Sequence, residues 1–102
     1  MRVKEKLTQD EILRALSEHG EILNNCRVRK IGLFGSFVRG EQKADSDIDF
    51  LVEFEEPTFD RFMDLVLYLE DLFGRNVELI TTDGLSPHLR PYVTREVRWH
   101  EG

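Results

Sequence analysis

The sequence has almost no cysteine. Its 102 residues include one, Cys26, and the three histidines His19, His88 and His100 lie far apart in the chain. A single cysteine cannot form an internal disulfide bond, and zinc sites need several Cys or His side chains at short spacings. The composition therefore excludes a disulfide-stapled fold and argues against a structural zinc site.

Long apolar runs are also missing, and proline and glycine are few. No stretch approaches the roughly 18 apolar residues of a membrane span, and the charged first six residues are not followed by an apolar signal segment. Hydrophobic residues at 40% and charged residues at 33% are typical of a globular protein. We expect one domain over residues 1–102, located in the cytoplasm and without membrane contact.

An excess of positive charge is absent as well. Lys and Arg number 14 against 20 Asp and Glu, which gives a formal net charge of -6. Such a surface repels the phosphates of a long polynucleotide. General nucleic-acid binding is therefore not expected.

The chain begins with a pattern that predicts an amphipathic helix from Thr8 to about Asn25. Thr8 and Glu11 form a capping-box pattern, and apolar residues follow at helical spacing. Gly20 lies inside this stretch and is expected to shorten or split the helix, because glycine costs about 1 kcal/mol there relative to alanine.

Two strands are predicted next, Val28 to Phe34 and Asp47 to Phe54, both rich in apolar and β-branched residues. Only a dozen residues separate them. This is too short for a comfortable parallel crossover, so the pair is expected to be antiparallel around a short helical turn.

The second half of the chain predicts helix, strand and helix. A helix should begin at Pro57-Thr58 and end near Phe73, followed by a strand over Asn76–Thr81 and a short helix from Ser86-Pro87 to about Val97. Together these elements predict an α+β fold with a small mixed sheet flanked by helices. The stripe expected to face the core from the long helix is Phe59, Phe62, Met63, Val66, Leu69 and Phe73.

Gly35 and Ser36 end the first strand and lead into the short helical turn. Such a turn presents backbone N–H groups, a small hydroxyl and the positive end of a helix dipole, which together suit a phosphate. Arg39 follows closely and has the forked geometry that binds phosphate. Its alternative role is an ion pair with Glu41 or Asp45.

Asp47 and Asp49 open the second strand. Residues two apart on a strand point to the same side, so their charges repel unless a cation bridges them. Carboxylate oxygens suit Mg²⁺ or Mn²⁺, which complete their shell with phosphate oxygens and water. The apolar residues that follow predict that the pair is buried, where unpaired carboxylates are costly.

Glu78 is the best candidate for a third carboxylate. It is expected on the face of its strand opposite Val77 and Leu79. A third carboxylate would help to hold two metal ions and would accept the proton of an attacking hydroxyl. The alternative is an ordinary exposed charge on an edge strand.

Gly35-Ser36, ten intervening residues, and then Asp47 and Asp49, with Arg39-Gly40 between them, resemble the signature of the polymerase-β-like nucleotidyltransferase superfamily. The resemblance covers most of the chain, from the first helix to the segment 89–96. The short length is similar to that of the minimal nucleotidyltransferases (MNT, or MntA-like, antitoxins), many of which are encoded beside a HEPN-domain toxin.

This resemblance implies an antitoxin that transfers AMP from ATP to a tyrosine of such a toxin. By the same resemblance, Gly35 and Ser36 would hold the triphosphate, Asp47 and Asp49 the metal ions, and Glu78 the third carboxylate position. Larger relatives have a second domain for the acceptor, which this sequence lacks. The alternative is therefore a non-catalytic binding module that neutralises the toxin by forming a stoichiometric complex; transfer to a small molecule is a third, weaker interpretation.

Overall fold

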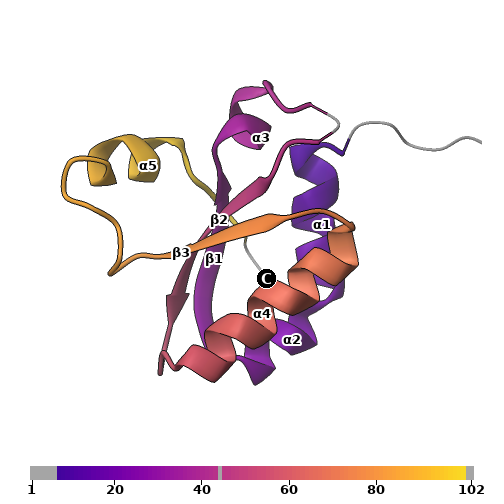
Figure 1. Ribbon diagram of the computed structural model, residues 1–102, viewed down its shortest axis with the longest axis vertical. Helices are drawn as coiled ribbons and strands as arrows, with labels where there is room; N and C mark the ends of the chain where they lie inside the picture. Colours follow the sequence, from indigo (N-terminus) through magenta and orange to yellow (C-terminus); the bar gives the residue numbers. More distant parts are fainter. Residues whose placement is uncertain (1–6, 44, 101–102) are drawn as a thin grey trace, which may run out of the picture.

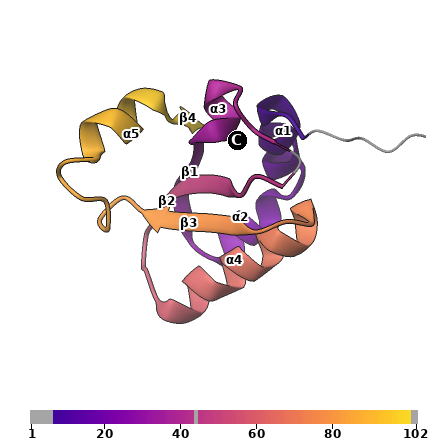
Figure 2. The same ribbon diagram turned by 45° about the horizontal axis from the view of Figure 1, so that its top comes forward.

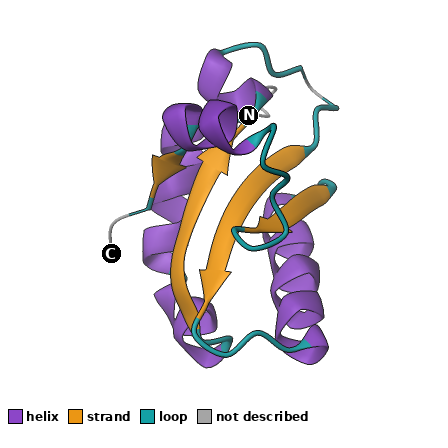
Figure 3. Ribbon diagram, turned by 90° about the vertical axis from the view of Figure 1, so that its left-hand side faces the viewer, coloured by secondary structure: helices purple, strands orange, loops and turns teal. Residues whose placement is uncertain are grey.

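A four-stranded mixed sheet forms the centre of the computed structural model, which describes residues 7–43 and 45–100 (Figure 1). The strand order is β3-β2-β1-β4. β1 and β2 are antiparallel, as their opposed arrows in Figure 3 show, whereas β2 and β3 are parallel. The predicted α+β class and the antiparallel first pair are confirmed. The strands are β1 (Val28–Phe34), β2 (Ile48–Phe54), β3 (Val77–Thr81) and β4 (Arg98–Trp99).

Two short helices replace the first predicted helix. They are α1 (Gln9–Glu18) and α2 (Gly20–Asn25). The capping box is present, because the Thr8 side chain accepts from the Glu11 N–H while the Glu11 side chain accepts from the Thr8 N–H. The chain breaks between the helices at His19, so the predicted split at Gly20 is confirmed.

The longest helix is α4 (Phe59–Phe73), close to its predicted bounds. The Thr58 hydroxyl accepts from the Arg61 N–H at its start, and Gly74 ends it with a left-handed φ of 67°. The predicted core stripe was partly wrong. Leu65 and Leu69 are fully buried, whereas Phe59 is 76% exposed because it is the first residue of the helix and lies beyond the core.

The core lies between one face of the sheet and the helices α1, α2 and α4. Figure 2 shows α2 and α4 below the sheet and α5 (Arg90–Glu96) above it. Alternate residues of β2 point into this core, and Asp49 lies between two of them on the opposite face. The largest fully buried side chains of the core cluster are Phe37, Phe50, Ile12, Leu16, Ile31, Leu33, Ile48, Leu65, Leu69 and Val52.

The last helix begins later than predicted, at Arg90 rather than near Ser86. The Ser86 hydroxyl instead accepts from the Leu89 N–H in a preceding turn, at 3.3 Å. Pro91 then occupies the first turn of α5, where its missing N–H costs nothing. β4 was not predicted; its residues pair with Gly32 and Leu33 of β1.

None of the helices formed by residues 7–43 and 45–100 is both long enough and apolar enough to cross a bilayer.

Candidate active site

The turn that follows β1 is built around Gly35. Its φ of 84° and ψ of -151° lie in a region that is essentially restricted to glycine. A Cβ at this position would also lie 3.1 Å from Asp49 Cγ and closer still to Asp49 Oδ2. The turn leads directly into α3 (Ser36–Arg39), which the buried side chain of Phe37 anchors in the core. Glycine is therefore required both for the backbone conformation and for the close approach to Asp49.

Two of the predicted carboxylates are neighbours across adjacent strands. Asp49 of β2 is in register with Glu78 of β3, and on its other side it faces Phe34 at the end of β1. Glu78 is exposed on the face opposite the buried Val77 and Leu79, as predicted. The strand pairing thus places Asp49, Glu78 and the Gly35 turn together on the sheet face that lies away from α4.

The surroundings of Asp49 disfavour its charge. Burial is the largest cause, and the negative charges of Glu78 and Asp47 add to it, so that the pKa of Asp49 rises from 3.8 to about 6. Asp47 contributes although it precedes β2 and is exposed. The site therefore concentrates negative charge that a cation would neutralise.

The predicted burial of the aspartate pair was wrong. Asp47 is exposed and Asp49 is only half-buried, and none of the charged residues that the structure describes is fully buried. The apolar residues that motivated the prediction occupy the core face of β2 and its centre, whereas the aspartates lie where the strand begins. An open position of this kind leaves room for a substrate.

The donor set fits a divalent cation that binds together with a nucleotide. Within residues 7–43 and 45–100, no group of three or more Asp, Glu, His or Cys side chains is placed so that it could hold a metal ion. Mg²⁺ does not need such a group, because it usually takes one or two protein carboxylates and completes its shell with phosphate oxygens and water. Asp47 and Asp49, with Glu78 beside them, match that requirement.

Arg39 is held by two carboxylates. Its Nε lies 3.0 Å from Glu41 Oε1, and its Nη1 lies 2.9 Å from Glu96 Oε1. The alternative of an ion pair with Glu41 is thus confirmed, and among the described residues no pair with Asp45 forms. Half of the Arg39 side chain stays exposed, so it also remains open to a phosphate.

A pocket of about 330 Å³ opens directly at this site. Its floor is formed by the Gly35 turn and Asp49, and one of its walls is formed by α5. The Tyr92 and Leu89 side chains of that wall are 68% and 55% exposed. The lining residues are Phe34, Gly35, Arg39, Asp49, Leu89, Tyr92, Val93 and Glu96.

Residues 9–100 match the protein family described as the nucleotidyltransferase domain. This chain belongs to that family. The predicted enzyme class, a nucleotidyltransferase, is confirmed. Of the predicted site residues, Gly35, Arg39 and Asp49 line the pocket, whereas Ser36, Asp47 and Glu78 are not part of its lining.

Relatives of this nucleotidyltransferase match over nearly their whole length. The protein adenylyltransferase MntA of Thermococcus cleftensis is 46% identical over 93 residues, which are 89% of this chain and 94% of that protein. A solved structure provisionally assigned as a minimal nucleotidyltransferase is 32% identical, with a TM-score of 0.79, and the match covers 93% of this chain and 98% of the other. The predicted resemblance to the minimal nucleotidyltransferases is confirmed.

A more distant structural match shares only the fold. It is the complex of a tri-AMPylated HEPN toxin of Shewanella oneidensis with its MNT antitoxin. The match is 20% identical, has a TM-score of 0.62, and covers 84% of this chain and 68% of the other.

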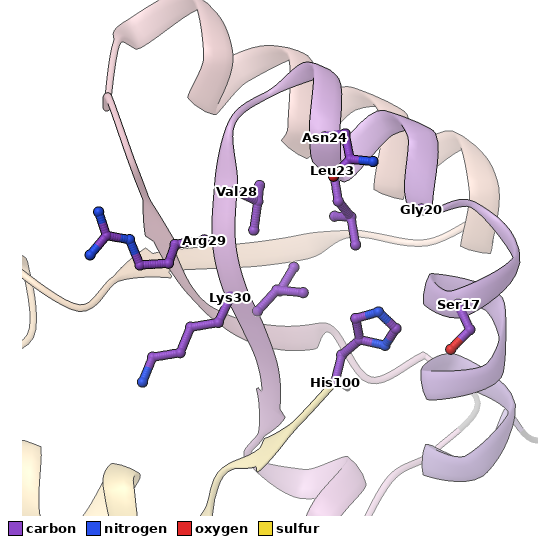
Figure 4. A pocket seen from close by; sticks show the side chains of 9 residues that line it. Ser17, Gly20, Leu23, Asn24, Val28, Arg29, Lys30 and His100 are labelled. Carbon is purple, nitrogen blue, oxygen red and sulfur yellow. The ribbon is translucent and has the colours of Figure 1, made fainter. Parts of the chain in front are cut away.

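The nucleotidyltransferase has a second pocket, of about 320 Å³, that none of the predicted site residues lines. It lies between β1 and the junction of α1 and α2, with Ser17, Leu23 and His100 around it (Figure 4). Arg29 and Lys30 also line it, with the charged ends of their side chains on the other side of β1 in this view. Among the described residues, none lines both this pocket and the one at Gly35 and Asp49.

Five residues of the pocket lining were not predicted as site residues: Phe34, Leu89, Tyr92, Val93 and Glu96. Glu96 contacts the predicted motif directly. Its Oε2 accepts from the Gly35 N–H at 2.7 Å. No motif marks Glu96, since it lies 61 residues from Gly35 in the chain. The position of the last helix, which only the folded structure gives, brings the two together.

Proposed function

We propose that this protein transfers AMP from ATP to a hydroxyl group of a partner protein, a tyrosine of a HEPN-type toxin, and thereby acts as a cytoplasmic antitoxin. The observation that carries the proposal is the packing of the Gly35 turn against Asp49, with Glu78 in register on the adjacent strand. This arrangement brings a turn suited to phosphate next to neighbouring carboxylates, at the pocket that Gly35 and Asp49 line.

The comparisons support the choice of nucleotide and acceptor. The relative that is 46% identical is named a protein adenylyltransferase. The more distant fold relative is an MNT antitoxin in complex with a tri-AMPylated HEPN toxin. A family member with an intact motif is therefore expected to use ATP and to act on a toxin of that kind.

The substrate would be held by residues from three elements. Gly35 and Ser36 would receive the triphosphate, with Arg39 as a further phosphate contact. A magnesium or manganese ion held by Asp47 and Asp49, and assisted by Glu78, would supply the positive charge that phosphoryl transfer requires. The exposed rings and side chains of the α5 wall leave the mouth of the pocket open to a protein acceptor.

The reaction exchanges one bond at the α-phosphorus of ATP. The acceptor hydroxyl oxygen bonds to the α-phosphorus, while the bond from that phosphorus to the bridging oxygen breaks and pyrophosphate leaves. The hydroxyl proton goes to a carboxylate, for which Glu78 is the candidate because it lies beside Asp49 and is exposed. The products are the AMP-modified partner and pyrophosphate.

The decisive experiment measures the intact mass of the partner toxin after incubation with this protein, Mg²⁺ and each nucleoside triphosphate in turn. A mass increase equal to one or more AMP groups is expected with ATP and Mg²⁺, and none with the other nucleoside triphosphates. Peptide mapping should then place the modification on tyrosine, and a metal chelator should prevent it.

The matched control pair is Asp49→Asn and Glu53→Gln. Both residues lie on β2 and are partly buried, but Glu53 pairs with Arg29 and Lys30 outside the pocket. Asp49→Asn should abolish the mass increase, and Glu53→Gln should preserve it. If the wild-type protein forms a stable complex with the toxin but leaves it unmodified with every nucleotide, the protein is instead a non-catalytic antitoxin.

A further inference from the structure

Glu96 joins two parts of the pocket through one side chain. Its Oε2 accepts from the backbone N–H of Gly35 at 2.7 Å, and its Oε1 accepts from Arg39 Nη1 at 2.9 Å. The side chain is only 23% exposed. Both donors belong to the segment that the proposed function assigns to the triphosphate, whereas Glu96 itself belongs to α5.

The Gly35 turn needs support of this kind. Glycine adopts this backbone region without a steric clash, but it has the most conformational freedom to lose, so hydrogen bonds are needed to hold it in one arrangement. The Gly35 carbonyl already accepts from the N–H groups of Val38 and Arg39 at 3.0 and 3.2 Å. The Gly35 N–H in turn donates to Glu96 Oε2. The peptide groups on both sides of Gly35 are therefore held.

The α5 helix needs support for a different reason. The structure describes every residue of this helix, and each is at least partly exposed. Burial of apolar side chains therefore contributes little to the position of the helix. Its side chains nevertheless form one wall of the pocket, through Tyr92 and Val93. The two charge-assisted bonds of Glu96 are therefore a main attachment between this wall and the turn.

We propose that Glu96 is a positioning residue for AMP transfer: its bonds to Gly35 and Arg39 hold the turn and the α5 wall in the arrangement that receives the triphosphate. This inference rests on the proposed function. Glu96 acts through Gly35 and Arg39, and it does not need to touch the reacting atoms.

The test compares Glu96→Gln with Glu41→Gln. A glutamine at position 96 keeps its length but has one acceptor oxygen, so it can satisfy only one of the two donors. Glu41 is the matched control because its side chain binds the same guanidinium at 3.0 Å. Its described contact with the turn is made by its backbone N–H, which donates to the Ser36 carbonyl and is kept in Glu41→Gln.

Steady-state transfer kinetics should show KM for ATP raised about tenfold in Glu96→Gln, the loss expected for one hydrogen bond to a charged group. The change in kcat should be smaller than threefold, because the turn binds the substrate before the reaction. Glu41→Gln should stay within about twofold of the wild type in both constants. A lower or unchanged KM in Glu96→Gln, or an equal effect of Glu41→Gln, would overturn the proposal.

Two further measurements do not depend on turnover. Calorimetry with Mg²⁺ and an ATP analogue that has a methylene group between the α and β phosphorus atoms should show the same tenfold loss of affinity. The amide proton of Gly35 should move upfield in the NMR spectrum of Glu96→Gln and stay in place in Glu41→Gln. If the wild type transfers no AMP, the proposed function fails, whereas these two readouts still decide the role of Glu96.

Discussion

The backbone of Gly35 passes directly against the carboxylate of Asp49, so closely that a side chain on residue 35 would overlap it. Gly35 lies in the turn directly after β1 and Asp49 lies in β2, and the two strands pair up to this point through Phe34 and Asp49. The turn proposed to bind phosphate and the carboxylate proposed to bind metal thus share one boundary. Neither can be changed in size without moving the other.

Gly35→Ala should therefore abolish nucleotide binding and destabilise the fold by about 1–3 kcal/mol, the cost of holding a residue with a Cβ in this backbone region. The matched control is Gly40→Ala. Gly40 also has a positive φ, of 74°, but a Cβ there meets nothing within 4 Å. Calorimetric binding of the ATP analogue should be lost in the first variant and kept in the second; equal binding by both would contradict the steric argument.

Asp49→Asn should remove transfer and yet stabilise the protein. The amide does not carry the charge that burial, Glu78 and Asp47 disfavour. After allowance for solvent screening, the gain in the free energy of unfolding at pH 7 is about 1 kcal/mol without metal. Chemical denaturation with a chelator present measures it, and a less stable Asp49→Asn protein would show that Asp49 is structurally required.

The raised pKa of Asp49 should also make the free energy of unfolding depend on pH. A carboxyl group whose pKa rises from 3.8 to about 6 on folding binds more protons in the folded state. Its contribution to stability is fully present below pH 3.8 and is lost as the pH rises through about 6. The difference in the free energy of unfolding between Asp49→Asn and the wild type should thus grow from pH 4 to 6 and then level off.

Glu78→Gln distinguishes a third catalytic carboxylate from an edge-strand charge. If Glu78 accepts the hydroxyl proton, kcat should fall about a hundredfold while the melting temperature stays unchanged, because the side chain is exposed. Asp83→Asn, another exposed acid soon after β3, is the control and should leave kcat unaltered. Full activity of Glu78→Gln would identify Glu78 as an ordinary surface charge.

Thr58→Ala tests the start of α4. The Thr58 hydroxyl accepts from the Arg61 N–H at 3.1 Å, and its loss should cost about 1 kcal/mol, which lowers the melting temperature by about 4–8 °C in a domain of this size. Thr58→Ser retains the oxygen and should melt within about 2 °C of the wild type. Similar melting of all three proteins would show that this cap contributes nothing.

Much of the fold was predictable because local signals specify it. The bounds of β1, the capping box at Thr8 and the end of α4 at Gly74 follow from residue types in short windows. Two residues of the predicted motif, Gly35 and Asp49, line the pocket for the same reason. Its glycine requirement is local, and the alternation of β2 places Asp49 opposite the core.

What escaped prediction depends on tertiary contacts. β4 has only two residues, too few for any periodic pattern, and forms because β1 offers an open edge. The exposure of Phe59 and of Asp47 reflects where the core ends, which no window of sequence reveals. Glu96 reaches the site only through the path of the chain after β3.

The path of the chain also sets the order in which the pocket is made during synthesis. Glu96 bonds to Gly35, and Trp99 pairs with Gly32, so residues that leave the ribosome late complete a turn that left it early. A nascent chain that has not yet exposed residues 90–99 lacks one wall of the pocket and the hydrogen bond between Glu96 and the Gly35 turn. The pocket is therefore complete only after these residues have joined the fold.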